Sequence, residues 1–276
     1  MIAILAALQS ELEPLRRYVR LEAPVRAPAA TFAPGLWHGR GIVTVRTGVG
    51  KVHAAMATQS VLDRYSPAQI VVIGSAGALT DDLPLGTILV PREVAPHDVG
   101  TFFPGGFRPG SRLVSSPAGP RVFVRAFPCA AGLVEAALAC GRERGHPVRE
   151  GKLLSGDQAI FSTARRDWLR RTFDALAVDM ESAAVAQVAA AHDVPLLVLR
   201  AISDHAGDQT GFDTTPIHQA ANAPPSVVGR TIGLARRARY LLTHPRSAWR
   251  RHRFQRGITV ASEHIALLLD RLWRDA

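Results

Sequence analysis

The sequence of 276 residues is poor in cysteine and contains no long uncharged run. Its two cysteines, Cys129 and Cys140, cannot form a disulfide framework, and their spacing suits neither a zinc site nor a redox pair. A membrane-spanning helix is excluded because every stretch of about 18 residues carries a charge. The N-terminus, MIAILAALQSE, has no basic flank and only a short apolar stretch, which argues against a secretory signal. We therefore expect a cytoplasmic protein in a reducing compartment.

Charge is distributed unevenly along the chain. The formal net charge is +10, and residues 230–276 contribute 11 arginines against three acids, so the preceding residues are nearly neutral. A neutral body argues against a nucleic-acid-binding surface, and no specific nucleic-acid partner is expected. The basic segment is instead predicted to meet an anionic partner or to stay solvated.

Apolar runs alternate with helix-like patterns over the first 205 residues. Buried-type or β-branched runs predict strands, and apolar residues spaced three and four apart predict helices. This alternation indicates a largely parallel sheet covered on both faces. Residues 96–120, rich in Gly, Pro and Phe, are predicted to form a long loop. The predicted strands are 1–7, 41–48, 69–77, 86–91, 122–127, 151–157, 175–181 and 195–204, and the predicted helices are 10–20, 49–65, 130–145 and 182–193.

The pattern changes after residue 205. Residues 226–243 are predicted to be helical, and a short basic helix is expected after Pro245. Gly257 is predicted to separate that helix from a last one over 258–274. In the last helix apolar residues repeat every three to four positions, which is typical of an amphipathic helix.

Polar clusters follow several of the predicted strands at the point where each strand ends. One acid after a strand is usually a helix cap. Here several converge, and ligands of open α/β sheets bind at the carboxyl ends of strands. Carboxylates without a Cys/His cluster suit proton transfer or the stabilisation of a cationic transition state, as in glycosidic cleavage. The clusters are Glu11, the GSAG turn at 74–77, the SGD segment at 155–157, Asp179 with Glu181, and Arg200 with Ser203 and Asp204.

Other motifs do not match their templates. The segment TGVGKV at 47–52 lacks the leading Gly and the trailing Ser/Thr of a phosphate-binding loop, and it lacks the third Gly of a dinucleotide fingerprint. The GSAG turn is not the elbow of a serine hydrolase. The pairs His97-Asp98 and His192-Asp193 have no metal-ligand spacing. Neither a metal nor another cofactor is expected.

Eight segments within the first 230 residues form a series. They are AALQSELEPL (6–15), RTGVGKVHAA (46–55), VIGSAGAL (72–79), LGTILVP (85–91), HDVGTFF (97–103), LLSGDQAIF (153–161), VDMESAAVAQV (178–188) and VPLLVLRAISDHA (194–206). In this order they resemble the nucleoside phosphorylase/nucleosidase family, most closely its methylthioadenosine/S-adenosylhomocysteine nucleosidase branch. The resemblance implies an α/β fold, a three-layer α/β/α sandwich with a mixed, barrel-like central sheet. It also implies a homo-oligomer, with a dimer favoured.

The resemblance divides the chain into two parts. Residues 1–230 would form the catalytic domain of the nucleoside phosphorylase/nucleosidase type. Residues 231–276 would form a basic, amphipathic helical extension at the C-terminus.

Three acids are assigned to catalysis by the resemblance. Asp204 matches the general acid that protonates N7 of the purine, and such a step contributes roughly 10²–10⁴-fold to the rate. Glu181 matches the acid that binds the ribose hydroxyls, and its charge would stabilise an oxocarbenium-like transition state. Glu11 matches the residue that holds and activates the attacking water in the hydrolytic branch. The structural alternatives are a helix cap for Asp204 and an ion pair with Arg200 for Glu181.

Seven further residues are expected to bind the substrate. They are Ser75, Gly77, Ala159, Ile160, Met180, Arg200 and Ser203. The first two would lie near the nucleophile and the ribose, and Met180 would pack on the ribose. The backbone of Ala159 and Ile160 would face the adenine edge. Nucleosidases of the family usually have an aromatic residue at the place of Ala159, so stacking on the base is expected from Phe161 instead.

The sequence therefore predicts a purine nucleoside N-ribosyl hydrolase that releases the free base from a 5′-modified adenosine. Water is favoured over phosphate because Glu11 is present and because Val72 stands where the family's phosphorylases often have an arginine. Two alternatives stay open: a phosphorylase on the same scaffold, and a nucleoside-binding or membrane-associated protein without catalysis. The substrates left open are methylthioadenosine, adenosylhomocysteine, a futalosine-type nucleoside and a lipid-linked, hopanoid-type adenosine.

Residues 236–274 join arginines and aromatic residues to an apolar stripe. This is the composition of an interfacial membrane helix, and it predicts contact with an anionic membrane surface at the inner face of the membrane. A lipid-linked substrate would favour such a location. The alternative is that the stripe packs on the enzyme's own body or on a second subunit, with the arginines solvated.

Overall fold

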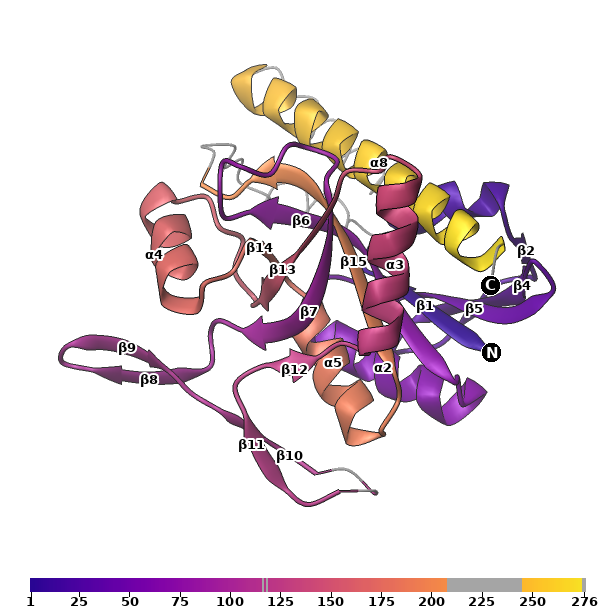
Figure 1. Cartoon of the computed structure of the whole chain (residues 1–276), viewed down its shortest axis with the longest axis horizontal. Coiled ribbons are helices and arrows are strands. Elements are labelled where there is room, and N and C mark those ends of the chain that lie inside the picture. Colours follow the sequence, from indigo (N-terminus) through magenta and orange to yellow (C-terminus); the bar gives the residue numbers. More distant parts are fainter. Residues whose placement is uncertain (116, 118, 208–244, 275–276) are drawn as a thin grey trace, which may run out of the picture.

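The computed structural model describes residues 1–115, 117, 119–207 and 245–274, and for 245–255 it describes the backbone alone. In this part of the chain eleven strands form one mixed sheet, around which the helices pack (Figure 1). The sheet consists of β1 (Ile2–Ala6), β2 (Arg20–Leu21), β3 (Val25–Arg26), β4 (Thr31–Trp37), β5 (Arg40–Arg46), β6 (Gln69–Ala78), β7 (Ile88–Pro96), β12 (Phe127–Pro128), β13 (Val148–Ser155), β14 (Ala177–Asp179) and β15 (Leu196–His205).

Seven helices accompany the sheet in the described residues, and four of them pack in pairs, α2 beside α5 and α3 beside α8 (Figure 1). They are α1 (Gln9–Leu12), the 3-10 helix η1 (Glu13–Arg17), α2 (Lys51–Tyr65), α3 (Ala131–Glu143), α4 (Thr163–Phe173), α5 (Ser182–Ala191) and α8 (Pro245–Arg274).

Part of the sheet closes into a barrel. β6 pairs with β14 and β15, β7 pairs with β13 and β15, and β13 pairs with β14, so these five strands form a ring. On the other side of β6, β1 continues the sheet through β5 to β4. The predicted fold class, a mixed and barrel-like sheet covered by helices, is confirmed.

The three strands β1, β6 and β15 place the polar clusters at one edge. β1 and β15 both run parallel to β6, and their middle residues are buried on both faces, which explains their unbroken apolar runs. Their carboxyl ends therefore lie together, and the polar residues that follow each strand meet there.

Several local predictions are corrected by the structure. The helix predicted over 10–20 is a short α-helix followed by η1, because Pro14 at the start of η1 has no N–H to continue an α-helical ladder. The long loop predicted over 96–120 contains, in its described part, one hairpin and the first strand of a second. The two hairpins are β8 (Gly100–Phe103) with β9 (Gly106–Pro109), and β10 (Arg112–Val114) with β11 (Val122–Val124). Both hairpins project from the body (Figure 1).

Two elements carry no clear pattern in the sequence. β4 contains Pro34 and Gly35, which usually indicate a turn, and Gly35 is needed because the backbone of Arg20 crosses directly over it. α4 has charged side chains at five of its eleven positions and buries only Leu169, so it has no apolar stripe to reveal it.

The predicted break at Gly257 is wrong, because α8 runs through it without interruption. At this point the helix touches the backbone of Ser203, and a Cβ atom would collide with the Ser203 carbonyl. Gly257 therefore permits close packing rather than ending a helix.

The apolar stripe of the last helix packs on the body. Trp273 meets Trp37 edge to face with ring centroids 4.8 Å apart, and Trp37 donates from Nε1 to Asp270 over 3.2 Å. The alternative in which the stripe packs on the enzyme itself is thus the one observed for 258–274. The buried stripe consists of Ile258, Ala261, Ile265, Leu268, Leu269 and Trp273.

Three further predictions fall on residues that the structure leaves undescribed. These are the loop after residue 207, the helix over 226–243 and the domain boundary at 230, which all stay predictions. None of the described helices is long and apolar enough to cross a bilayer.

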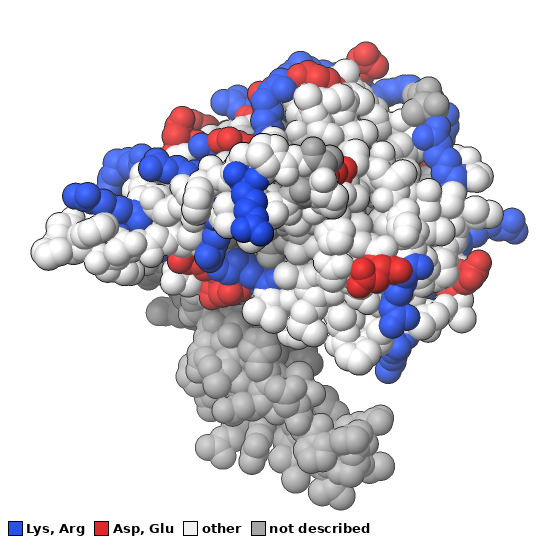
Figure 2. All heavy atoms as spheres, turned by 90° about the horizontal axis from the view of Figure 1, so that it is seen from below, with Lys and Arg blue, Asp and Glu red and all other residues white. Residues whose placement is uncertain are grey.

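Charge on the described surface is mixed. On the face shown in Figure 2, lysine and arginine side chains are scattered among acids and a broad uncharged area, without a continuous basic surface. The concentrated basicity of the chain belongs instead to the arginines from residue 236 onwards.

Candidate active site

A cavity of about 370 Å³ opens at the carboxyl ends of β1, β6, β14 and β15. This is the size of a small-molecule pocket, and its position follows the rule for α/β sheets. Of the ten predicted site residues, all but Arg200 line it. The lining consists of Ala7, Leu8, Glu11, Val49, Ser75, Ala76, Gly77, Gln158, Ala159, Ile160, Phe161, Val178, Asp179, Met180, Glu181, Ser203, Asp204, Ala206 and Ile258.

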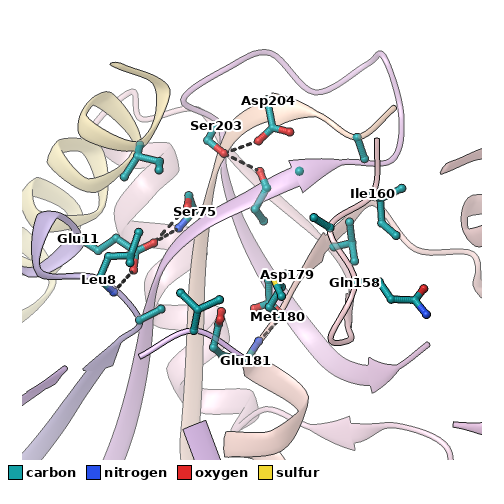
Figure 3. A pocket seen from close by; sticks show the side chains of 18 of the residues that line it. Leu8, Glu11, Ser75, Gln158, Ile160, Asp179, Met180, Glu181, Ser203 and Asp204 are labelled. Atoms are coloured by element: carbon teal, nitrogen blue, oxygen red, sulfur yellow. Dashed lines mark hydrogen bonds between the residues drawn. The ribbon is translucent and has the colours of Figure 1, made fainter. Parts of the chain in front are cut away.

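Glu11 is held rigidly by the turn that follows β6. Its Oε1 accepts hydrogen bonds from the backbone N of Ser75 at 3.0 Å and from the Ser75 hydroxyl at 3.1 Å. Its Oε2 accepts from the backbone N of Leu8 at 2.9 Å. Figure 3 shows this group on one side of the pocket, with Gln158 and Ile160 on the other. Three donors fix the carboxyl group of Glu11 in one orientation.

Arg200 lies behind the pocket wall rather than in it. It is buried in β15, and its Nε lies 2.8 Å from Oδ2 of Asp179 while its Nη2 donates to Oε2 of Glu181 at 3.2 Å. The structure thus brings Arg200 to the two acids at the end of β14 and not to the lining of the cavity. Its role in this geometry is to orient Glu181.

Glu181 is a buried acid with a perturbed proton affinity. Besides Arg200, it accepts a hydrogen bond from the backbone N of Gly50 at 3.0 Å. Burial is the main effect on its pKa, and it prevails over the opposing pull of Arg200, with Asp179 adding like charge. The pKa of Glu181 is thereby raised to about 7. Such a value is typical of acids in functional sites.

Asp204 reaches the pocket through an irregularity in β15. The register between β15 and β6 shifts between Ile202 and Asp204, which is a bulge. Bulges of this kind redirect side chains next to active sites. The Ser203 hydroxyl donates to Oδ1 of Asp204 over 2.6 Å, and Oδ2 of Asp204 lies beside Gly77.

The loop at 158–161 forms the wall opposite Glu11. The carbonyl of Ile160 accepts a hydrogen bond from Gly207 N at 3.0 Å, which ties the loop to the residues after β15. Phe161 lines the cavity two residues beyond Ala159, and 38% of it is exposed. The aromatic residue expected to stack on the base is therefore part of the lining.

Sequence reasoning assigned no site role to several lining residues, among them Leu8, Val49, Asp179 and Ile258. Leu8 and Val49 are apolar residues directly after β1 and before α2, and Asp179 was recognised only as a neighbour of Glu181. Ile258 comes from α8, more than fifty residues after Asp204 along the chain. Only the tertiary packing of α8 on β15 could bring it there.

The described lining of the cavity carries four carboxylates and no cation. The acids are Glu11, Asp179, Glu181 and Asp204, and no Lys, Arg or His of the described residues lines the cavity. The described part of the chain contains no cluster of three or more residues able to hold a metal ion. The chemistry available at this site is therefore proton transfer and the stabilisation of positive charge.

Comparison with known proteins identifies the family. The family model described as "Phosphorylase superfamily" matches residues 1–229, and the chain belongs to this family. A 5′-methylthioadenosine/S-adenosylhomocysteine nucleosidase of Anoxybacillus flavithermus is 34% identical over 222 residues, which cover 80% of this chain and 92% of that protein. An aminodeoxyfutalosine nucleosidase of Helicobacter pylori is 30% identical over 215 residues, covering 76% and 88%.

Solved structures share the fold. The futalosine hydrolase of Helicobacter pylori strain 26695 superposes with a TM-score of 0.74 at 24% identity, covering 100% of this chain and 97% of that one. At this level of identity the likeness shows the fold alone.

Proposed function

We infer that the protein is a nucleosidase that hydrolyses the N-glycosidic bond of an adenosine-type purine nucleoside and releases the free base. Its family, its relatives and the chemistry of the cavity all support this function. The observation that carries it is the lining itself, to which the described residues contribute four carboxylates and no cation around a nucleoside-sized pocket.

On the base side, Asp204 is the general acid. It donates its proton to N7 of the purine as the C1′–N9 bond breaks, so that the bonding electrons leave with a neutral base. Ser203 contacts the same carboxyl group and orients it. The loop at 158–161 faces the base, and Phe161 stacks on it.

On the ribose side, Glu181 binds the hydroxyl groups and Met180 packs against the ring. As the glycosidic bond breaks, the ribose acquires oxocarbenium character, and the negative charge of Glu181 and Glu11 stabilises it. Arg200 holds Glu181 in place from behind.

The nucleophile is water. A phosphate dianion would have to enter a cavity lined by four acids, and no cation of the described lining could receive it. Glu11 instead accepts a proton from the attacking water, whose oxygen bonds to C1′. Val72, the position of the family's phosphorylase arginine, is buried in β6 and outside the lining.

Product analysis tests this reaction. The protein is incubated with adenosine-type nucleosides with and without phosphate, and free base and sugar are measured. We expect adenine and a free ribose derivative at a rate independent of phosphate. Formation of a ribose 1-phosphate would establish the phosphorylase alternative, and binding without turnover would establish the non-catalytic one.

The 5′ substituent is proposed to be apolar and uncharged. Leu8, Val49 and Ile258 are apolar residues of the lining. The charged group beside Leu8, opposite the loop at 158–161, is Glu11, which is assigned to the attacking water (Figure 3). Methylthioadenosine meets this description better than adenosylhomocysteine, whose amino-acid group is zwitterionic. A panel of methylthioadenosine, adenosylhomocysteine, aminodeoxyfutalosine and alkyl-adenosines ranks the substrates by kcat/KM. Preference for adenosylhomocysteine would contradict the assignment.

A homodimer is proposed from an exposed apolar surface. Val52 and Met56 on α2 are 68% and 47% exposed, and Phe102 on β8 is 80% exposed. Lys51 at the start of α2 bonds to Asp98, which lies two residues before β8, so the start of α2 lies at the base of this hairpin. A second copy of the chain would cover these side chains. Light scattering should give twice the chain mass, and Val52→Asp should shift it towards the monomer.

Membrane contact is proposed for residues 236–256 rather than for the whole segment 236–274. The apolar stripe is buried on the body, but eight arginines with Trp249 and Phe254 remain in the sequence before it. Each basic residue near an anionic leaflet contributes about 1 kcal/mol. Flotation with anionic liposomes should fall with added salt and with Arg→Gln changes at 250, 251 and 253. Salt-insensitive flotation, or none, would exclude this peripheral location at the inner membrane face.

A further inference from the structure

Three sequence motifs that the reaction leaves unused meet at one place beside the pocket. Lys51 belongs to TGVGKV, Asp98 to the His97-Asp98 pair, and Asp157 to the SGD segment. The ammonium Nζ of Lys51 lies 2.7 Å from each carboxylate oxygen of Asp98 and 3.7 Å from Oδ2 of Asp157. The backbone N of Asp157 in turn donates to Oδ2 of Asp98 at 3.1 Å. We call these three residues the Lys51 cluster.

The cluster joins two walls of the pocket through the start of α2. The backbone N of Lys51 donates to Oδ1 of Asp157 at 2.8 Å, and the preceding backbone N, of Gly50, donates to Oε1 of Glu181 at 3.0 Å. The backbone N–H groups of two adjacent residues thus bind Glu181, the acid on the ribose side, and Asp157, which directly precedes the loop at 158–161. A single peptide unit therefore separates the bonds to the two walls.

A lysine at position 51 fits a role in binding the two acids. A cation at the first position of a helix is unfavourable, because the N-terminus of the helix carries partial positive charge. Helix stability therefore does not explain it, whereas binding two acids does. Lysine is also scarce in this chain, with Lys152 the only other one among 33 basic residues. Its compact ammonium fits between two carboxylates where a planar guanidinium would need more room.

The residues before the loop at 158–161 also pack closely against His97. His97 is fully buried, and its ring lies against Gly156, where a Cβ atom would collide with Nε2 of His97. Gly156 thus allows the loop to lie directly on the residue that precedes Asp98. Backbone and side chain both fix where the loop at 158–161 begins.

We propose that Lys51, Asp98 and Asp157 are positioning residues for the hydrolytic reaction, which hold the base-facing loop at 158–161 in a fixed relation to Glu181. The inference rests on the proposed assignment of the base to this loop. Base and ribose have to be held in one relative geometry while the bond between them breaks, and a displacement of about 1 Å can cost a hundredfold in rate.

Variants of the cluster test the proposal against a matched lysine. Lys51→Met removes the ammonium at similar length, Asp98→Asn keeps the shape of the acid, and the double variant combines them. Lys152→Met is the control, because Lys152 bonds to Glu93 at 2.6 Å with 30% of its side chain exposed, against 24% for Lys51. Calorimetric binding of free adenine, KM and kcat for methylthioadenosine, and the thermal unfolding midpoint are measured for each.

We expect Lys51→Met to weaken adenine binding and to raise KM by roughly tenfold, and Asp98→Asn to have similar effects. In the double variant, adenine affinity and KM should be no worse than in either single variant. Lys152→Met should leave adenine binding and KM unchanged. Adenine affinity within twofold of the unmodified protein in both single variants, or fully additive effects in the double variant, would overturn the proposal. If Lys51→Met does not fold, Asp98→Asn decides by the same criterion. Failure of the unmodified protein to bind adenine would overturn the assignment of the base to this loop, and this inference with it.

Discussion

Arg200 donates from Nη2 to Oε2 of Glu181 over 3.2 Å, where only 1% and 8% of the two side chains are exposed. The same guanidinium bonds to Asp179, and Gly74 leaves room for it, since a Cβ atom there would collide with Nη1 of Arg200 and lie 2.7 Å from Oε1 of Glu11. One buried cation therefore lies among three acids. This arrangement keeps Glu181 in place while leaving the pocket itself acidic.

Arg200→Gln should lower the free energy of unfolding by about 3–5 kcal/mol, because it leaves buried carboxylates without their cation. Urea denaturation at neutral pH measures this, with Arg200→Lys as the control that keeps the charge and should lose less. A loss below about 1 kcal/mol would mean that the acids are not held by Arg200.

Asp204→Asn should reduce base release by at least about 100-fold, because the amide keeps the shape of the acid but cannot donate the proton to the leaving purine. The thermal unfolding midpoint should stay unchanged. Adenine release under saturating substrate measures the effect. A variant that keeps more than about a tenth of the activity would place the general acid elsewhere.

The pH dependence of kcat/KM should reflect the protonation of Glu181. Its pKa, raised to about 7 mainly by burial, means that the acid becomes protonated as the pH falls through that value. The protonated form cannot stabilise the ribosyl cation, so kcat/KM should fall by about tenfold per pH unit on the acid side. In Glu181→Gln the remaining activity should lose this limb. A profile that keeps the limb in the variant would assign it to another group.

Stability should fall as the pH decreases below the ordinary range of histidine. Burial lowers the pKa of His97 from 6.5, and neither ring nitrogen has a partner among the described residues. The unfolded state therefore binds the proton first, and stability is lost as the pH drops through about 6.5. His97→Leu should lose less stability than the unmodified protein between about pH 7 and pH 5.5. His53→Leu, at an exposed position, should show the unmodified slope.

Gly257→Ala should separate α8 from β15. A Cβ atom at this position collides with the Ser203 carbonyl, and the expected loss in the free energy of unfolding is about 1–3 kcal/mol. Activity should fall as well, because Asp204 directly follows Ser203. Gly132→Ala in α3 is the control, since nothing lies within 4 Å of a Cβ atom there. Equal effects of the two changes in chemical denaturation and activity would show that the contact at Ser203 is unimportant.

The long strands were predictable because their signal is local. β1, β5, β6 and β15 are buried runs whose apolar residues can be identified without any partner, and the polar residues after β1, β6 and β15 indicate the edge where a site forms. The roles of Glu11, Glu181 and Asp204 came from the family resemblance, and the structure places all three in one cavity.

The hairpins and β4 were not predictable, because their residues carry turn signals such as Pro34 and Gly35. Pairing with a neighbouring strand, rather than an apolar pattern, makes these segments strands. Likewise, Gly257 has the composition of a helix break, and only its contact with Ser203 shows why glycine is used there.

By itself the sequence determined the class of fold, the edge of the sheet where the cavity opens and the acids that gather there, because apolar periodicity and the order of motifs are properties of short segments. Only the tertiary structure decided three things: that Arg200 orients Glu181 from behind the wall, that the stripe of α8 is buried and brings Ile258 to the pocket, and that Lys51 binds Asp98 and Asp157. Each of these depends on the distance between residues far apart in the chain, which packing alone sets.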